Sequence, residues 1–215
     1  MRVGKPGYVI LSDISMYGTA ELMDIERAAR VCYRSEGLIT EQGESAKRLI
    51  ARLIKSGHEA MLEHSLLSVE FTCDRAIANE LERHRLAAFA QESTRYCNYN
   101  ADKFGSEITC IPPSNFLDEK SLAYNSWLSS CDVAEKVYLA MVKSGIAKPQ
   151  DARAVLPLSL STKVVVTTNY REWRHIFKLR TAKDAHPDMR ALMIPLLKDL
   201  KELIPVIFDD IEVEE

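Results

Sequence analysis

The sequence predicts an α+β fold in which mixed helices pack on an antiparallel sheet within a single compact domain. Two observations lead to this class. Segments with helical periodicity and short apolar runs typical of strands follow one another without the regular strand–helix–strand alternation of a parallel sheet. The chain has 215 residues, 47% of them hydrophobic, which is enough to bury one core and fits one domain over residues 1–215.

The first part of the chain carries clear helix and strand signals. Apolar residues spaced three or four apart indicate helices, and short runs rich in Val, Leu and Phe indicate strands. In chain order we expect a strand at 8–11, helices at 20–33 and 44–56, a strand at 65–72, and a helix from an Asp74 N-cap to about Arg85.

The second part continues the mixed order. Residues 86–100 resist assignment and end in a polar, aromatic loop, and Pro112 and Pro113 mark a break. After them we expect a long helical stretch at about 116–143, a buried strand at 159–168, a helix at 170–180 whose Asn169 and Glu172 resemble a capping box, and a final amphipathic helix at 187–203.

Composition and charge exclude several classes of protein. The formal net charge of −3 differs from that of a strongly basic nucleic-acid binder, so an anionic ligand must be met by a local arginine cluster. The five cysteines include no CxxC pair, and no Cys/His group has zinc-ligand spacing, so we expect reduced thiols and no metal. Neither a signal peptide nor a membrane span is visible, and we expect a cytoplasmic protein.

The densest group of unusual side chains lies in residues 82–96. Arg83 and Arg85 would point in different directions on a helix, which suits two anionic groups or one extended ligand. Ser93 and Arg95 would face one side of an extended loop and offer converging donors to a phosphate. A charged, solvated helix end would also explain the pattern, but the apolar run 86–90 should be buried and should draw the flanking charges into a partly desolvated place.

Two further arginines are candidates. Arg180 shares a helix face with Trp173 and Phe177, so it is either an arginine that extends from the core to solvent or a guanidinium held in a site by apolar walls. Arg153 precedes Pro157 in a short helix, where an ion pair would explain it equally well.

One combination of these residues resembles a known family. Arg83-His84-Arg85, seven further residues, Ser93 and then Arg95-Tyr96 are similar to the signature of flavin-dependent thymidylate synthases. Three further segments fall in the order of that family: 58–64, 152–157, and Asn169 followed by Arg180. The resemblance covers most of the chain, from about residue 30 to residue 190.

The resemblance implies reductive methylation of dUMP to dTMP, with methylenetetrahydrofolate as one-carbon donor and NADPH-reduced FAD as hydride source. It also implies a homotetramer with active sites shared between subunits, and no nucleic-acid or membrane partner. The residues that it implies for dUMP binding are Glu80, Arg83, Gln91, Ser93, Arg95, Arg153 and Arg180, and among them Arg180 would activate the uracil ring. The residues that it implies for FAD binding are Arg83, His84, Arg85, Gln91, Asn169 and His175. His58 and Glu63 match positions near flavin and folate.

The chain departs from the usual family pattern at a few positions, which are Ala60, Glu80, Ala88, His175 and His186. Three alternatives therefore stay open. They are a nucleic-acid-binding module, a catalytically inactive scaffold with the same fold, and a flavoprotein acting on a related pyrimidine. The intact arginine set disfavours the scaffold, and the net negative charge disfavours the nucleic-acid module.

Overall fold

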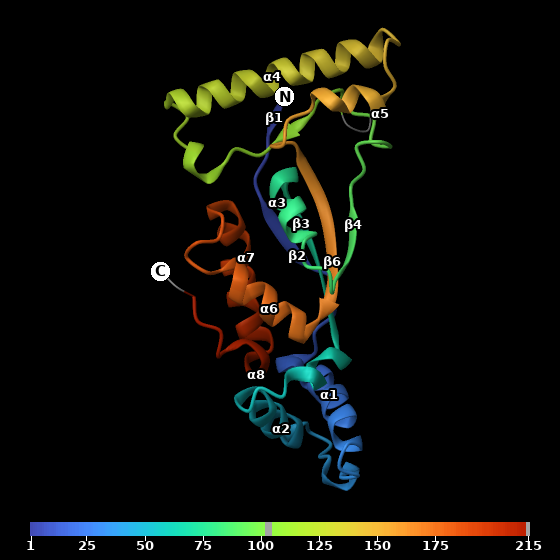
Figure 1. The fold of residues 1–215 in the computed structure, drawn as a ribbon, viewed down its shortest axis with the longest axis vertical. Coiled ribbons are helices and arrows are strands. Elements are labelled where there is room, and N and C mark those ends of the chain that lie inside the picture. The colour runs from blue at the N-terminus through green and yellow to red at the C-terminus, as the bar shows by residue number, and fades with distance from the viewer. Residues whose placement is uncertain (102–104, 214–215) are drawn as a thin grey trace. The chain divides into compact units, whose positions relative to one another are not determined.

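The computed structural model describes residues 1–101 and 105–213, and its strands form two sheets (Figure 1). The strands are β1 (Arg2–Val3), β2 (Gly7–Ile10), β3 (Leu66–Asp74), β4 (Ala88–Gln91), β5 (Thr109–Cys110) and β6 (Ser161–Asn169). β1 and β5 pair in parallel as a two-stranded sheet, and the larger sheet has the order β2-β3-β6-β4.

The helices fall between these strands in the mixed order that the sequence predicts. The α-helices are α1 (Thr19–Val31), α2 (Glu44–Lys55), α3 (Arg75–Leu81), α4 (Leu122–Lys143), α5 (Pro149–Ala152), α6 (Tyr170–Arg180), α7 (Pro187–Leu203) and α8 (Pro205–Phe208). The 3₁₀ helices are η1 (Met16–Gly18), η2 (Glu36–Leu38), η3 (Glu59–His64), η5 (Ser114–Phe116) and η6 (Arg153–Val155).

The two long strands β3 and β6 run antiparallel. Tyr170 N–H donates to Ser65 O at 3.3 Å, and Arg75 N–H donates to Leu160 O at 3.1 Å. Residue numbers therefore rise along one strand as they fall along the other. Both strands alternate between buried and less buried residues, as expected for strands with one face on a core. The α+β class with an antiparallel sheet is confirmed.

The helix expected to reach Arg85 is shorter than predicted. Asp74 caps it as expected, because its Oδ1 accepts from Ile77 N at 2.7 Å. The helix nevertheless ends at Leu81, where Arg83 N–H donates to the Glu80 carbonyl three residues back and tightens the last turn. Arg83 and Arg85 therefore lie in a connecting turn and not on a helix.

The apolar run 86–90 is not buried as predicted. Leu86 is 75% exposed, and Ala88 and Ala90 are exposed as well. Ala88 and Ala90 belong to β4, an edge strand that has a neighbouring strand on one side only, and Leu86 lies in the turn that precedes it. The helical stretch expected from residue 116 also begins later, at Leu122, after the Ser121 hydroxyl caps it by accepting from Tyr124 N.

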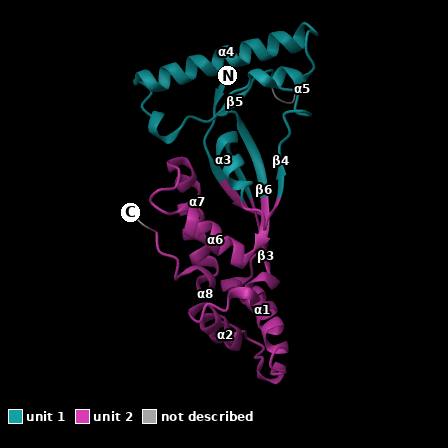
Figure 2. Ribbon diagram, viewed as in Figure 1, with its two compact units in different colours: residues 1–7, 70–83, 89–165 teal, residues 8–69, 84–88, 166–215 magenta. Residues whose placement is uncertain are grey.

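The chain folds as two compact units, shown in different colours in Figure 2. Unit 1 comprises residues 1–7, 70–83 and 89–165, and unit 2 comprises residues 8–69, 84–88 and 166–215. Strands β3 and β6 contribute residues to both units. The expectation of one domain over residues 1–215 stays a prediction.

Each unit has its own apolar core. In unit 2, helices α6, α7 and α8 pack together, and the rings of Trp173, Phe177 and Phe208 are in contact and fully buried. In unit 1, α4 packs on α5 and η6, and Tyr99 meets Tyr138 edge to face within the core. No helix in the described part of the chain is long and apolar enough to cross a membrane.

Candidate active site

The turn between α3 and β4 places three consecutive residues, two arginines and the histidine between them, in different surroundings. Arg83 and Arg85 are exposed, whereas His84 between them is only 6% exposed. Ala87 N–H donates to the His84 carbonyl at 3.2 Å and closes the turn. The two guanidinium groups therefore face solvent while the imidazole is enclosed by unit 2.

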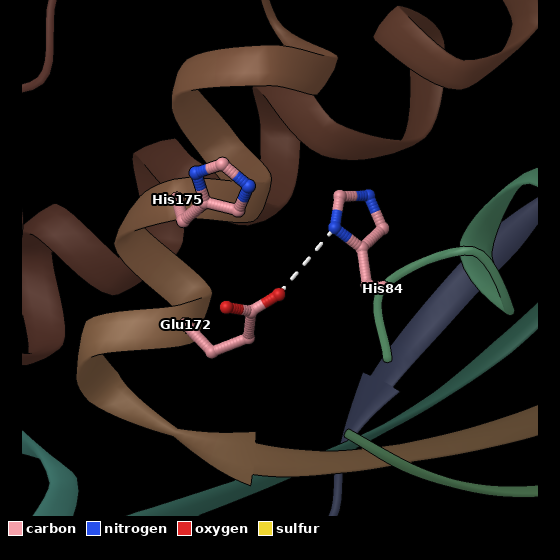
Figure 3. A group of neighbouring side chains, drawn as sticks. All are labelled: His84, Glu172 and His175. Carbon is pink, nitrogen blue, oxygen red and sulfur yellow. Dashed lines mark ion pairs between the residues drawn. The ribbon is translucent and has the colours of Figure 1, made fainter. Parts of the chain in front are cut away.

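The His84 ring contacts two residues of α6 through its two nitrogens. Arg180 Nε donates to His84 Nε2 at 3.0 Å, and His84 Nδ1 lies 3.5 Å from Glu172 Oε1 (Figure 3). The ring of His175 meets that of His84 edge to face at 6.0 Å between centroids. Burial, reinforced by the positive charge of Arg180 and by His175, lowers the pKa of His84 from 6.5 to about 4. His84 is therefore uncharged at neutral pH.

Arg180 occupies the face of α6 that the sequence predicts. Trp173 and Phe177 on that face are buried, and Arg180 itself is half-buried at the end of the helix. Its Nε bond to His84 holds the guanidinium against a neighbouring segment of the chain. The arrangement is that of a guanidinium held by partners, and not of one that only extends from the core into solvent.

A cavity of about 540 Å³ in unit 2 adjoins this group. Its lining residues are Glu59, Glu63, Leu86, Asn169, Arg171, Glu172, His175 and Lys178. Asn169, His175 and Glu63 were all predicted to lie near the flavin. The exposed Leu86 adds an apolar surface to a lining that is otherwise polar or charged and that offers both donors and acceptors.

Asn169 lines this wall and also caps α6. Its Oδ1 accepts from Glu172 N at 2.9 Å and caps α6, so its amide NH₂ is the group that remains to bind a ligand. The predicted capping box is only half formed, because Oε1 of Glu172 faces His84 instead. Glu63 pairs with Arg171 at 2.6 Å on the surface.

A second group of predicted residues gathers in unit 1. Arg95 Nε donates to Gln150 Oε1 at 3.4 Å, and Arg153 Nη1 donates to Thr94 Oγ1 at 3.3 Å. These two contacts join the loop after β4 to the α5–η6 segment. The structure thus brings Arg153 to the loop that carries Ser93 and Arg95, and both guanidinium groups are exposed.

Gln91 lies at the start of that loop. Its Oε1 accepts from Arg75 Nη2 at 3.2 Å, while its Nε2 is buried and makes no hydrogen bond within residues 1–101 and 105–213. A buried donor of this kind is costly unless a ligand or water accepts from it. Of the remaining dUMP candidates, Glu80 is half-buried on α3, and Arg83 follows that helix in the exposed turn.

His58 lies apart from Glu63, although both were predicted near flavin and folate. His58 is exposed and lines a different cavity of about 420 Å³ in unit 2, together with Ala60, Met61 and residues of α1 and α2. Glu63 lines only the cavity beside His175 among those described.

Sequence reasoning missed several residues of these groups. Glu172 was considered only for capping, yet it lies one helical turn from His175 on α6, and that spacing is a signal that could have identified it. Together with His84, the two form a group whose ligand atoms lie within 4.8 Å of one another and which could hold a metal ion. Thr94, Gln150 and Arg75 carry no sequence signal, because only the fold brings them to their partners.

Comparison with known proteins agrees with these observations. A family model described as "Thymidylate synthase complementing protein" matches residues 16–206. The chain belongs to this family. Flavin-dependent thymidylate synthases of Geobacter sulfurreducens and Pyrococcus abyssi are similar to it. The first is 34% identical over 189 residues, which cover 85% of this chain and 78% of the relative. The second is 32% identical over 168 residues, which cover 76% of this chain and 67% of the relative.

Membership of the flavin-dependent thymidylate synthase family confirms the resemblance seen in the sequence. One solved structure shares the fold, a UMP/dUMP methylase from Streptomyces cacaoi bound with 5-Br dUMP. The TM-score is 0.76 at 23% identity, and the match covers 97% of this chain and 96% of the other. At that identity the likeness establishes the fold alone.

Proposed function

We propose that the protein converts dUMP to dTMP by reductive methylation, with methylenetetrahydrofolate as one-carbon donor and NADPH-reduced FAD as hydride source. The observation that carries this proposal is the family match over residues 16–206, within which the predicted Arg180 is held by His84 beside a ligand-sized cavity.

The cavity of unit 2 fits a flavin. His175 and the amide NH₂ of Asn169 offer hydrogen bonds to ring nitrogen and oxygen atoms, and Leu86 offers an apolar surface. Arg171 and Lys178, which pair with Glu63 and Glu59 in this structure, are the cations of the wall that we assign to the pyrophosphate. When FAD is bound and reduced, it supplies the hydride that makes the transferred carbon a methyl group.

The dUMP phosphate is assigned to the group in unit 1. Ser93 offers a hydroxyl, and Arg95 and Arg153 offer guanidinium groups that can bind phosphate oxygens by paired, charge-assisted hydrogen bonds. The unpaired Nε2 of Gln91 is a further donor for the nucleotide.

Arg180 is assigned to the uracil ring. A guanidinium at the N3–O4 edge stabilises negative charge that develops on the ring and thereby makes C5 more nucleophilic. The rest of the proposal follows the family. The protein assembles as a homotetramer with shared active sites, and it works in the cytoplasm, where its five free cysteines stay reduced.

Visible absorption of the purified protein tests the proposal. We expect an oxidised-flavin spectrum after addition of FAD, bleaching on addition of NADPH, and a spectral change with dUMP that is smaller with UMP. Turnover with methylenetetrahydrofolate should then yield dTMP. A protein that takes up no FAD and does not respond to dUMP would contradict the proposal and would favour a scaffold, while a stronger response to UMP would favour a related pyrimidine substrate.

A further inference from the structure

We propose that Glu172 is a positioning residue for Arg180, acting through His84. In this inference Glu172 fixes which nitrogen of His84 carries the proton, and His84 in turn fixes the plane of the Arg180 guanidinium. The catalytic consequence rests on the proposed function, in which Arg180 acts on the uracil ring, whereas the hydrogen-bond chain itself does not depend on it.

The three side chains form a continuous line. Arg180 Nε contacts His84 Nε2 at 3.0 Å. On the opposite side of the ring, His84 Nδ1 is 3.5 Å from Glu172 Oε1, the pair that Figure 3 joins with a dashed line. His84 and Glu172 are buried, at 6% and 7% exposure, so little water competes for these contacts. Glu172 and Arg180 belong to the same helix, and His84 belongs to the turn after α3.

The proton on His84 is determined by what each neighbour can do. A guanidinium donates only, so Nε2 of His84 must accept and its proton must be on Nδ1. An ionised Glu172 carboxylate can accept a hydrogen bond but cannot donate one, and it faces that Nδ1–H. Without this acceptor only the Arg180 contact favours the Nδ1–H form, and the Nδ1–H is left buried without its partner, while the alternative form would set an imidazole N–H against the Arg180 Nε–H.

A metal ion is a less favourable occupant of the same place. Nδ1 of His84 would have to give up its proton to bind a cation beside Glu172 and His175, and the proton would move to Nε2. That change creates the donor-to-donor contact with Arg180, and the guanidinium charge also repels a cation. The contacts therefore favour a hydrogen-bond chain over a metal site.

Substitutions of Glu172 test the catalytic consequence. Glu172→Leu replaces the accepting carboxylate with an apolar side chain of similar size. Glu172→Gln keeps a side-chain carbonyl that can accept from the Nδ1–H of His84. With FAD saturating, we expect Glu172→Leu to lower kcat by roughly ten- to a hundredfold, the scale for a residue that orients a functional histidine, with a smaller change in KM for dUMP. Glu172→Gln should recover most of the loss.

A charge control belongs in the same series. Glu202→Leu removes a carboxylate from an exposed position on α7 and should keep the parent kcat. Equal kcat losses in Glu172→Leu and Glu172→Gln, or no loss in either, would overturn the positioning assignment.

Nuclear magnetic resonance tests the chain independently of activity. Two-bond ¹H–¹⁵N spectra of the histidine rings at pH 7.5, assigned with His84→Gln, should show His84 with its proton on Nδ1 in the parent protein and in Glu172→Gln, and a mixture in Glu172→Leu. A proton on Nε2 in the parent protein would refute the inference, as would tight Zn²⁺ binding that His84→Gln and Glu172→Leu both abolish. The predicted tautomer in a protein without flavin or dUMP chemistry would refute only the proposed function.

Discussion

At the scale of single residues, burial decides the chemistry of the histidine in the Arg-His-Arg signature. Arg83 and Arg85 on either side of it are exposed, and His84 alone turns into unit 2. Its environment lowers its pKa to about 4, so the ring works as a neutral hydrogen-bonding group at physiological pH.

This lowered pKa predicts a pH-dependent stability. The unfolded chain has the ordinary histidine pKa of 6.5, so between about 6.5 and about 4 it binds a proton that the folded chain does not. The contribution of His84 to the free energy of unfolding is complete above pH 6.5 and decreases as the pH falls toward 4. Urea denaturation at pH 7.5, 6 and 5 should show a smaller decrease in His84→Gln than in the parent, and parallel profiles would contradict this.

For Arg180 we predict a loss of turnover. Arg180→Ala should reduce kcat by roughly two or more orders of magnitude, because one preorganised donor to developing charge is worth that much. Steady-state dTMP formation at saturating FAD measures it. Near-normal turnover in Arg180→Ala would remove this residue from the reaction.

Arg153 should affect binding instead. Its place beside the Ser93–Arg95 loop assigns it to the dUMP phosphate, whose charge does not change in the reaction. Arg153→Ala should raise the dissociation constant of dUMP with a smaller change in kcat, measured by titration of the flavin spectrum. Unchanged dUMP affinity would exclude Arg153 from the site.

At the scale of elements, α6 joins the core of unit 2 to the candidate site. One face carries the buried Trp173 and Phe177, and the other meets the cavity through Glu172 and His175. The helix is also fixed by Arg174, which is fully buried and pairs with Glu59 at 3.0 Å and with Asp210 near the end of the described chain. A shift of α6 would therefore move the core and the site together.

The cap of α3 gives a prediction at this scale. Asp74 is buried, and its Oδ1 accepts from Ile77 N at 2.7 Å. Asp74→Ala should lower the free energy of unfolding by about 1 kcal/mol or more, whereas Asp74→Ser should retain part of the cap. Urea denaturation measures both variants, and an Asp74→Ala variant as stable as the parent would contradict the assignment.

At the scale of the whole molecule, the predicted site residues fall into both units. The phosphate candidates Ser93, Arg95 and Arg153 belong to unit 1, while His84, His175 and Arg180 belong to unit 2. The resemblance to the family implies a homotetramer whose subunits share active sites. In such a tetramer, the assembly would decide which copies of these two groups act on one nucleotide.

Mixing two impaired variants, assayed at a dUMP concentration too low to saturate Arg153→Ala, tests this assembly. In a tetramer with shared sites, co-refolding or co-expression of Arg153→Ala with Arg180→Ala should restore part of the activity, because some sites then receive both intact arginines from different subunits. Each variant mixed with itself is the control. Activity that stays at the level of the controls would mean that one subunit supplies both residues, and a monomer mass near 24.3 kDa in light scattering would contradict the tetramer itself.

The sequence alone determined the local features of this protein. The caps at Asp74 and Asn169, the bounds of α1, α2 and α6 to within about two residues, and the apolar face of α6 shared by Arg180 follow from spacing and side-chain type. The signature at Arg83 to Arg95 indicated the family, because several fixed residues at fixed spacing are far more specific than any single motif.

Only the tertiary structure decided where these residues meet and in what state. Leu86 is exposed in the turn before the edge strand β4, and α3 ends at Leu81, before the turn in which His84 is buried. The pairing of His84 with Glu172 and Arg180 joins segments far apart in the chain, and no local pattern encodes it. The physical reason is that burial and hydrogen-bond partners depend on which elements pack together, and they set the proton on His84.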